Sequence, residues 1–168
     1  LASTDTYNLT EDGVVTTTFN TTAIDIDADI YSFYITDASG ELVESLAGDY
    51  GTLTVNKTTG SYDYSLAANA DQSSKVQALK EAEAVVDEFT ISVSDGSLSG
   101  SESITFKISG ANDAPTSVSL ANTSVNENAA GAVVGQLSAV DVDGDALTYE
   151  LSTVSADDSD LFTINSDN

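Results

Sequence analysis

The sequence predicts an all-β protein, a Greek-key β-sandwich with one short crossover helix, followed by an incomplete second sandwich. Three observations lead to this prediction. Short runs rich in Thr, Val, Ile, Tyr and Phe alternate apolar and polar residues, and turn residues separate them at intervals typical of sandwiches. A single segment has the composition and spacing of a helix. An acidic pattern occurs twice at a fixed distance, which indicates that a second copy of the module begins.

Seven strands are expected in the first copy. The clearest is Glu88–Ser94, whose strict alternation directs Phe89, Ile91 and Val93 into the core. The last strand, Ser101–Ser109, directs Ile104, Phe106 and Ile108 inward in the same way. The other five strands are expected near Thr4–Leu9, Val14–Phe19, Ile30–Thr36, Gly51–Val55 and Ser61–Ser65.

The predicted helix covers Ser74–Val85, which is full of helix-forming residues. Ser73 or Ser74 can cap its start, because a serine hydroxyl accepts from the free amides of a first turn. The apolar residues that recur at helical spacing are Val76, Leu79, Ala82 and Val86. We expect this helix to close one end of the sandwich as a connection between strands.

The repeat is carried by acidic and apolar residues in one register without gaps. Glu11 and Glu127 are 116 positions apart, and so are Asp25 and Asp141. The same offset pairs Ala23 with Ala139, Ile24 with Val140, Phe33 with Tyr149 and Ile35 with Leu151. We therefore expect a nearly whole module at residues 1–113 and a truncated one at residues 114–168, cut from a longer array.

The second copy contains apolar runs that predict further strands. These lie near Ala132–Leu137, Leu147–Leu151 and Phe162–Ile164. Half a sandwich leaves a sheet edge unpaired, and such an edge recruits other strands. We therefore expect residues 116–168 to be ordered only if that edge finds a partner, such as another copy of the chain.

Composition excludes several classes of partner. The chain has four Lys, no Arg, no His and 28 acidic residues, so its net charge is −24. Nucleic acid is excluded, because phosphate binding relies on Lys and Arg, and an anionic membrane surface is disfavoured for the same reason. No apolar run approaches the ~20 residues of a membrane-spanning helix.

There is no Cys, so an extracellular form needs a stabilising element other than disulfides, and calcium is the usual one.

The repeated carboxylates point to calcium. Hard cations take oxygen ligands, and a tight cluster of unpaired Asp otherwise repels itself. The alternative is that each Asp in a turn binds only its own backbone. Repetition in register with a Glu favours calcium for the pairs Asp25/Asp27 and Asp141/Asp143. An EF-hand is excluded, because Asp143 and Gly144 are followed by no bidentate Glu and no flanking helix.

The composition predicts that the protein is not an enzyme. No His or Cys is present as base or nucleophile, and no Arg is present to stabilise an oxyanion. Carboxylate pairs leave a glycosidase open by residue type. However, a small sandwich offers no deep cleft, and Trp, the usual platform for a sugar, is absent.

Several separated motifs carry a resemblance to known families. Residues 1–115 resemble the VCBS repeat through Tyr50–Asn56, Thr59–Leu66, Val76–Leu79, Asp87–Gly96 and Gly110–Pro115, in the order of that family. Residues 116–168 resemble the first half of a bacterial cadherin-like repeat through Val125–Asn128 and Ala139–Tyr149. Such repeats occur in very large secreted adhesins of Gram-negative bacteria, often exported by type I secretion and ending in RTX-type segments.

The resemblance implies an immunoglobulin/cadherin-like sandwich, an extracellular place on the bacterial cell surface, and a role in attachment or biofilm formation. We expect a calcium-stabilised extender whose partners are neighbouring repeats of the same protein. The alternative is a module that itself binds a glycan or a surface protein. The aromatic candidates for that alternative are Tyr31, Tyr34, Tyr50, Tyr62 and Tyr64, although such residues more often pack in the core.

The resemblance also implies which residues hold calcium at junctions between repeats. At the central junction the implied ligands are Glu11, Asp87, Asn112, Asp113, Asp141 and Asp143, with Asp87 the weakest member. At the opposite end of the first module they are Asp25, Asp27 and Asp95, and Glu127 would serve a junction beyond the second. Gly110 and Ala114 stand where the full cadherin linker has an Asp and an Asn, so fewer ions are expected.

Overall fold

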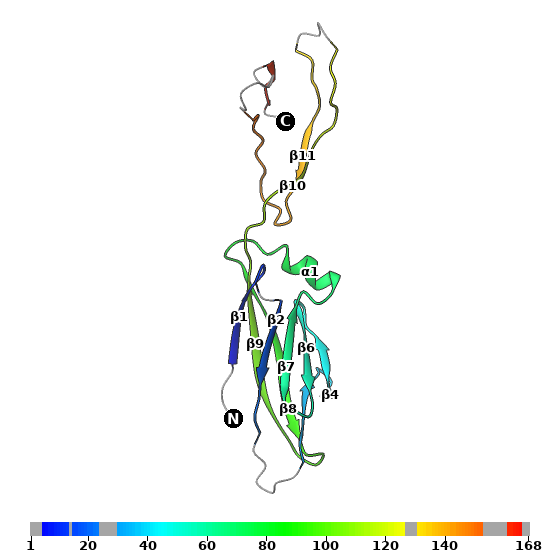
Figure 1. The fold of residues 1–168 in the computed structure, drawn as a ribbon, viewed down its shortest axis with the longest axis vertical. Coiled ribbons are helices and arrows are strands. Elements are labelled where there is room, and N and C mark those ends of the chain that lie inside the picture. The colour runs from blue at the N-terminus through cyan, green and yellow to red at the C-terminus, as the bar shows by residue number, and fades with distance from the viewer. Residues whose placement is uncertain (1–4, 14, 24–29, 127–130, 153–160, 166–168) are drawn as a thin grey trace. The chain divides into compact units, whose positions relative to one another are not determined.

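The computed structural model describes residues 5–13, 15–23, 30–126, 131–152 and 161–165. The chain divides into two compact units, Leu1–Asn112 (unit 1) and Asp113–Asn168 (unit 2). Unit 1 consists of two β-sheets with one short helix, α1, at one end of the sheets (Figure 1). The predicted all-β sandwich with a single short helix is therefore confirmed.

The described residues of unit 1 form nine strands in two sheets. These are β1 (Asp5–Thr10), β2 (Thr16–Asn20), β3 (Ser32–Thr36), β4 (Leu42–Val43), β5 (Ser45–Ala47), β6 (Gly51–Asn56), β7 (Ser61–Leu66), β8 (Ala84–Ser94) and β9 (Ser99–Ser109). One sheet has the order β1-β9-β8-β3-β4 and the other the order β2-β7-β6-β5. The pairing of β1 with β9 is parallel, whereas the other pairs in unit 1 are antiparallel.

The core lies between the two sheets and is rich in aromatic rings. The rings of Tyr64 and Phe106, from opposite sheets, stack with their centroids 3.8 Å apart. Phe89 meets both of these rings edge-on, which is a favourable arrangement for aromatic quadrupoles. The predicted core residues Phe89, Ile91, Ile104, Phe106 and Ile108 are all buried, and Val93 packs against them.

The helix differs from the prediction. It spans Ala70–Val76, because the Asn69 side chain caps it one turn earlier than expected by accepting from the Gln72 amide. Ala82 has a φ of 67°, and the predicted second half of the helix becomes the start of β8 at Ala84. Among the predicted apolar positions, Val76 and Leu79 are buried, whereas Ala82 and Val86 are exposed.

Short or weakly patterned strands account for the remaining differences. Strands β4 and β5 were not predicted, since two or three residues cannot establish an alternation. In unit 2, β10 (Thr116–Leu120) pairs antiparallel with β11 (Leu137–Val140). The strands predicted at Leu147–Leu151 and Phe162–Ile164 are absent, as both segments are described and neither pairs with another strand.

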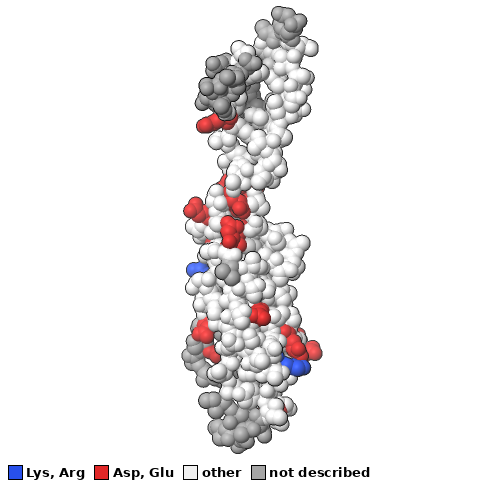
Figure 2. Space-filling model, in the orientation of Figure 1, with Lys and Arg blue, Asp and Glu red and all other residues white. Residues whose placement is uncertain are grey.

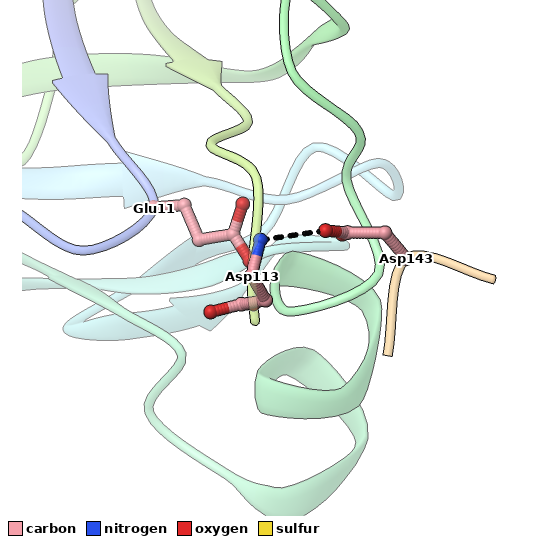
Figure 3. A group of neighbouring side chains, drawn as sticks. All are labelled: Glu11, Asp113 and Asp143. Carbon is pink, nitrogen blue, oxygen red and sulfur yellow. Dashed lines mark hydrogen bonds between the residues drawn. The ribbon is translucent and has the colours of Figure 1, made fainter. Parts of the chain in front are cut away.

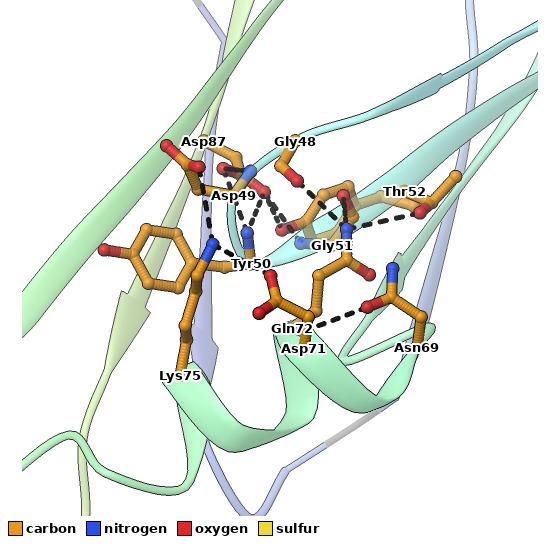
Figure 4. A network of polar contacts seen from close by, with 11 residues as sticks. Gly48, Asp49, Tyr50, Gly51, Thr52, Asn69, Asp71, Gln72, Lys75 and Asp87 are labelled. Carbon is orange, nitrogen blue, oxygen red and sulfur yellow. Dashed lines mark hydrogen bonds and ion pairs between the residues drawn. The ribbon is translucent and has the colours of Figure 1, made fainter.

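A buried carboxylate organises the end of unit 1 that carries α1 (Figure 4). Asp87 is only 4% exposed. Its Oδ1 accepts from the Asp49 amide at 2.9 Å, and its Oδ2 accepts from the Gly51 amide at 2.8 Å and from the Tyr64 hydroxyl at 2.7 Å. Gly48 must lack a side chain, because a Cβ there would lie 2.5 Å from the carboxylate.

The same turn docks the helix. Gln72 of α1 is buried, and its Nε2 donates to the carbonyls of Gly48 at 3.0 Å and Gly51 at 2.8 Å. Asp87 thus satisfies the amides of the β5–β6 turn, while Gln72 satisfies its carbonyls. Buried backbone groups need such partners, so the helix, the turn and β8 depend on one another.

Asp87→Ala should lower the free energy of unfolding by about 3 kcal/mol, because it leaves buried amides and a buried hydroxyl without an acceptor. Urea denaturation of the full chain, followed by tyrosine fluorescence, measures the loss. Glu88→Ala is the matched control, since Glu88 is the next residue of β8 and is exposed. Equal midpoints for the two variants would contradict the role assigned to Asp87.

Alkaline pH should destabilise unit 1 through Tyr62. Burial raises the pKa of Tyr62 to about 12, above its ordinary value of 10.0. Below pH 10 both the folded and the unfolded states keep the proton. Between pH 10 and 12 the unfolded state ionises first, so stability is lost as pH rises. Across this range the melting temperature should fall less steeply with pH for Tyr62→Phe than for the parent. Equal slopes of melting temperature against pH would refute the assignment.

Candidate metal centre

Three aspartates of unit 2 form a carboxylate cluster immediately after β11. Oxygens of Asp141, Asp143 and Asp145 lie within 4.8 Å of one another. The turn is built by Gly144, which has a φ of 68°, and by the Asp145 amide, which donates to Asp141 Oδ1 at 3.2 Å. Residues 113–168 contain no Lys or Arg, so the sequence of unit 2 offers no cation to balance these charges.

Asp143 is the central member of this cluster. It is 5% exposed, and its Oδ2 accepts from the Asp113 amide at 2.8 Å (Figure 3). Its Oδ1 is buried and has no hydrogen-bond partner among the residues that the structure describes. A buried charged oxygen without a donor is costly, and a hard divalent cation is the group that would offset this cost. The donor set is all oxygen, so these residues fit calcium.

Glu11 follows β1 in unit 1 and is held against the last residues of that unit. Its own amide donates to the Ser109 carbonyl at 3.0 Å. Its carboxylate accepts from the Ala111 amide through Oε2 at 2.9 Å and from Gln77 Nε2 through Oε1 at 3.2 Å. Glu11 therefore lies beside the segment that leads into Asn112 and Asp113.

Other predicted ligands have different surroundings. The Asp87 carboxylate is engaged by the amides and the hydroxyl described above. Asp95 caps a turn, since its Oδ1 accepts from Leu98 at 2.7 Å and Ser97 at 2.6 Å, and these two bonds lower the pKa of Asp95. This is the turn role that the sequence left open as an alternative. The predicted ligands Asp25, Asp27 and Glu127 lie outside the described residues.

Residues 1–110 match the family model of the bacterial cadherin-like domain. The chain belongs to this family. The match falls on unit 1, for which the motifs suggested a VCBS repeat, whereas the cadherin-like resemblance was noticed in residues 116–168. Bacterial cadherin-like character is therefore shown for the first unit.

One solved structure supports the fold of this cadherin-like chain. A crystal structure of human protocadherin-24 EC1-2, form II, is 23% identical, with 99% of this chain and 72% of that one covered and a TM-score of 0.53. Another crystal structure of human protocadherin-24 EC1-2 is 26% identical, with 84% and 57% covered and a TM-score of 0.43. The former shows a cadherin-like fold, which confirms the predicted fold class. No curated protein matches the chain.

Two residues near the candidate site, Asp145 and Gln77, were not predicted from the sequence. Asp145 was visible as the third acid of the run that begins at Asp141, and its spacing could have placed it in the cluster. Gln77 had no such signal, because it reaches Glu11 across 66 positions of sequence.

The surface of the cadherin-like chain carries more acidic than basic side chains, as the face in Figure 2 shows. None of the tyrosines considered as a sugar platform is fully exposed on this surface. Tyr62 and Tyr64 are fully buried, and Tyr31, Tyr34 and Tyr50 are partly buried.

Among the described residues, no helix combines the length and the apolar character needed to cross a membrane.

Proposed function

We propose that this chain is a calcium-stabilised extender module of a large secreted bacterial surface adhesin, serving attachment or biofilm formation. The observation that carries the proposal is the cluster of Asp141, Asp143 and Asp145, with one buried oxygen of Asp143 left without a donor. Membership of the bacterial cadherin-like family supports an adhesion module. Its partners in this role are neighbouring repeats outside the cell.

The proposed calcium ligands come from three segments of the chain. Asp141 and Asp143 supply the downstream pair, Asn112 and Asp113 the linker, and Glu11 the upstream carboxylate. The Ala111 amide binds Glu11 and the Asp113 amide binds Asp143, and these two amides are two residues apart in the chain. Calcium takes six to eight oxygens, more than the two carboxylates of Asp141 and Asp143 offer alone.

A bound calcium ion would neutralise the clustered carboxylates and fix the linker. The protein contributes the rest: Gly144 shapes the turn that presents the aspartates, and the Asp113 amide orients Asp143. A spacer of this kind needs a stiff linker but no cleft and no catalytic group. By the same resemblance, Asp25, Asp27 and Asp95 are proposed for a preceding junction and Glu127 for a following one. Asp87 is assigned a structural role.

Calcium should raise the melting temperature of the full chain, because an ion that binds only the native state stabilises it by mass action. At a free concentration of one hundred times Kd the gain is about 2.7 kcal/mol. Scanning calorimetry with calcium and with excess chelator measures the shift, and magnesium serves as the control ion. Superimposable curves in calcium and chelator would remove the metal from the proposal.

Asp143→Asn should weaken calcium binding at least about tenfold, or about 1.4 kcal/mol, since it removes a ligand charge while keeping the side-chain shape. Isothermal titration calorimetry on the full chain gives the affinity. Asp63→Asn changes the net charge equally, but Asp63 lies in β7 of unit 1 and outside the proposed ligand set. Equal affinities for both variants would exclude Asp143 as a ligand.

A further inference from the structure

We propose that Gln77, which caps the C-terminal end of α1, is a positioning residue that holds the Glu11 carboxylate in place for calcium. The inference rests on the proposed function and adds a residue and a mechanism to it. Nothing in the sequence pattern of the acidic repeat involves α1. The observation is a contact between a helix cap and the carboxylate of Glu11.

The two oxygens of Glu11 are held by two donors from different elements. Gln77 Nε2 donates to Oε1 at 3.2 Å, and the Ala111 amide donates to Oε2 at 2.9 Å. Ordering a free Glu side chain costs rotamer entropy. Glu11 is thus ordered before an ion arrives.

The position of Gln77 is itself determined by the core. Its amide donates to the Ser73 carbonyl at 3.0 Å, which fixes the residue at the end of the helix. Val76 before it and Leu79 after it are both buried in the core of unit 1. The side chain of Gln77 therefore starts from a backbone that has little freedom to move.

The helix is anchored in turn through Gln72, which binds the carbonyls of the turn at residues 48–51. The amides of that turn bind the buried carboxylate of Asp87. A continuous set of hydrogen bonds and core contacts thus leads from Asp87 through α1 and Gln77 to Glu11. Asp87 acts on the ion through this scaffold, and not as a ligand.

Donors that orient a metal ligand commonly account for 10-fold to 100-fold in affinity. Gln77→Met removes the donor and keeps the length of the side chain, so we expect calcium to bind about tenfold more weakly. The full chain is titrated with calcium by calorimetry, and its melting temperature is measured in chelator. The melting temperature in chelator should fall slightly, because the variant also removes a hydrogen bond to the buried Glu11 carboxylate. Ser74→Ala, an exposed neutral change on the same helix, is the control and should alter neither value.

A double-mutant cycle distinguishes positioning from a general weakening of the fold. In a Glu11→Gln background, Gln77→Met should cause no further loss of calcium affinity. An equal loss of calcium affinity in both backgrounds would overturn the positioning role. If the parent binds calcium and Gln77→Met binds it equally well, this inference fails and the proposed function stands. If the parent binds no calcium, the proposed function itself fails.

Discussion

The carboxylate of Asp87 is the group on which one end of unit 1 depends. Strand β8 carries it into the interior, where it accepts hydrogen bonds from the β5–β6 turn and from Tyr64. Removing a charge from water is expensive, and backbone amides with a hydroxyl offset that cost when their geometry is good. The turn so formed is the surface on which α1 docks. A single buried acid therefore links both sheets and the helix.

The strongly acidic composition is compatible with a stable sandwich because the acids lie mainly away from the core. Inward positions of the strands are mainly apolar or aromatic, with Asp87 of β8 the charged exception, while the outward row across β2, β7 and β6 contains Thr16, Ser65 and Thr52 in register. Threonine side chains are β-branched and uncharged, so they favour strands without adding charge. Repulsion is then concentrated in turns and linkers, where a divalent cation can relieve it.

Local patterns predicted much of the fold, and tertiary contacts account for what they missed. Strict alternation identified β8 and β9 because their inward residues are nearly all large and apolar. Helix composition misplaced α1, since the decisive signal was the Asn69 cap and not the apolar spacing. Register repetition brought Asp141 and Asp143 to notice as a pair, and the structure places both in one cluster with Asp145. The Gln77–Glu11 contact joins distant segments, so no window of sequence contains it.

The parallel pairing of β1 with β9 has a mechanical consequence. The first and last strands of unit 1 run side by side in one direction, paired from Asp5 with Ile104 to Thr10 with Ser109. Tension applied through the two ends of the unit pulls these strands past each other along their length. The rungs between them are then strained together, in shear, whereas an antiparallel terminal pair would open one rung at a time. Unit 1 is therefore expected to unfold only at a high pulling force when its chain is stretched.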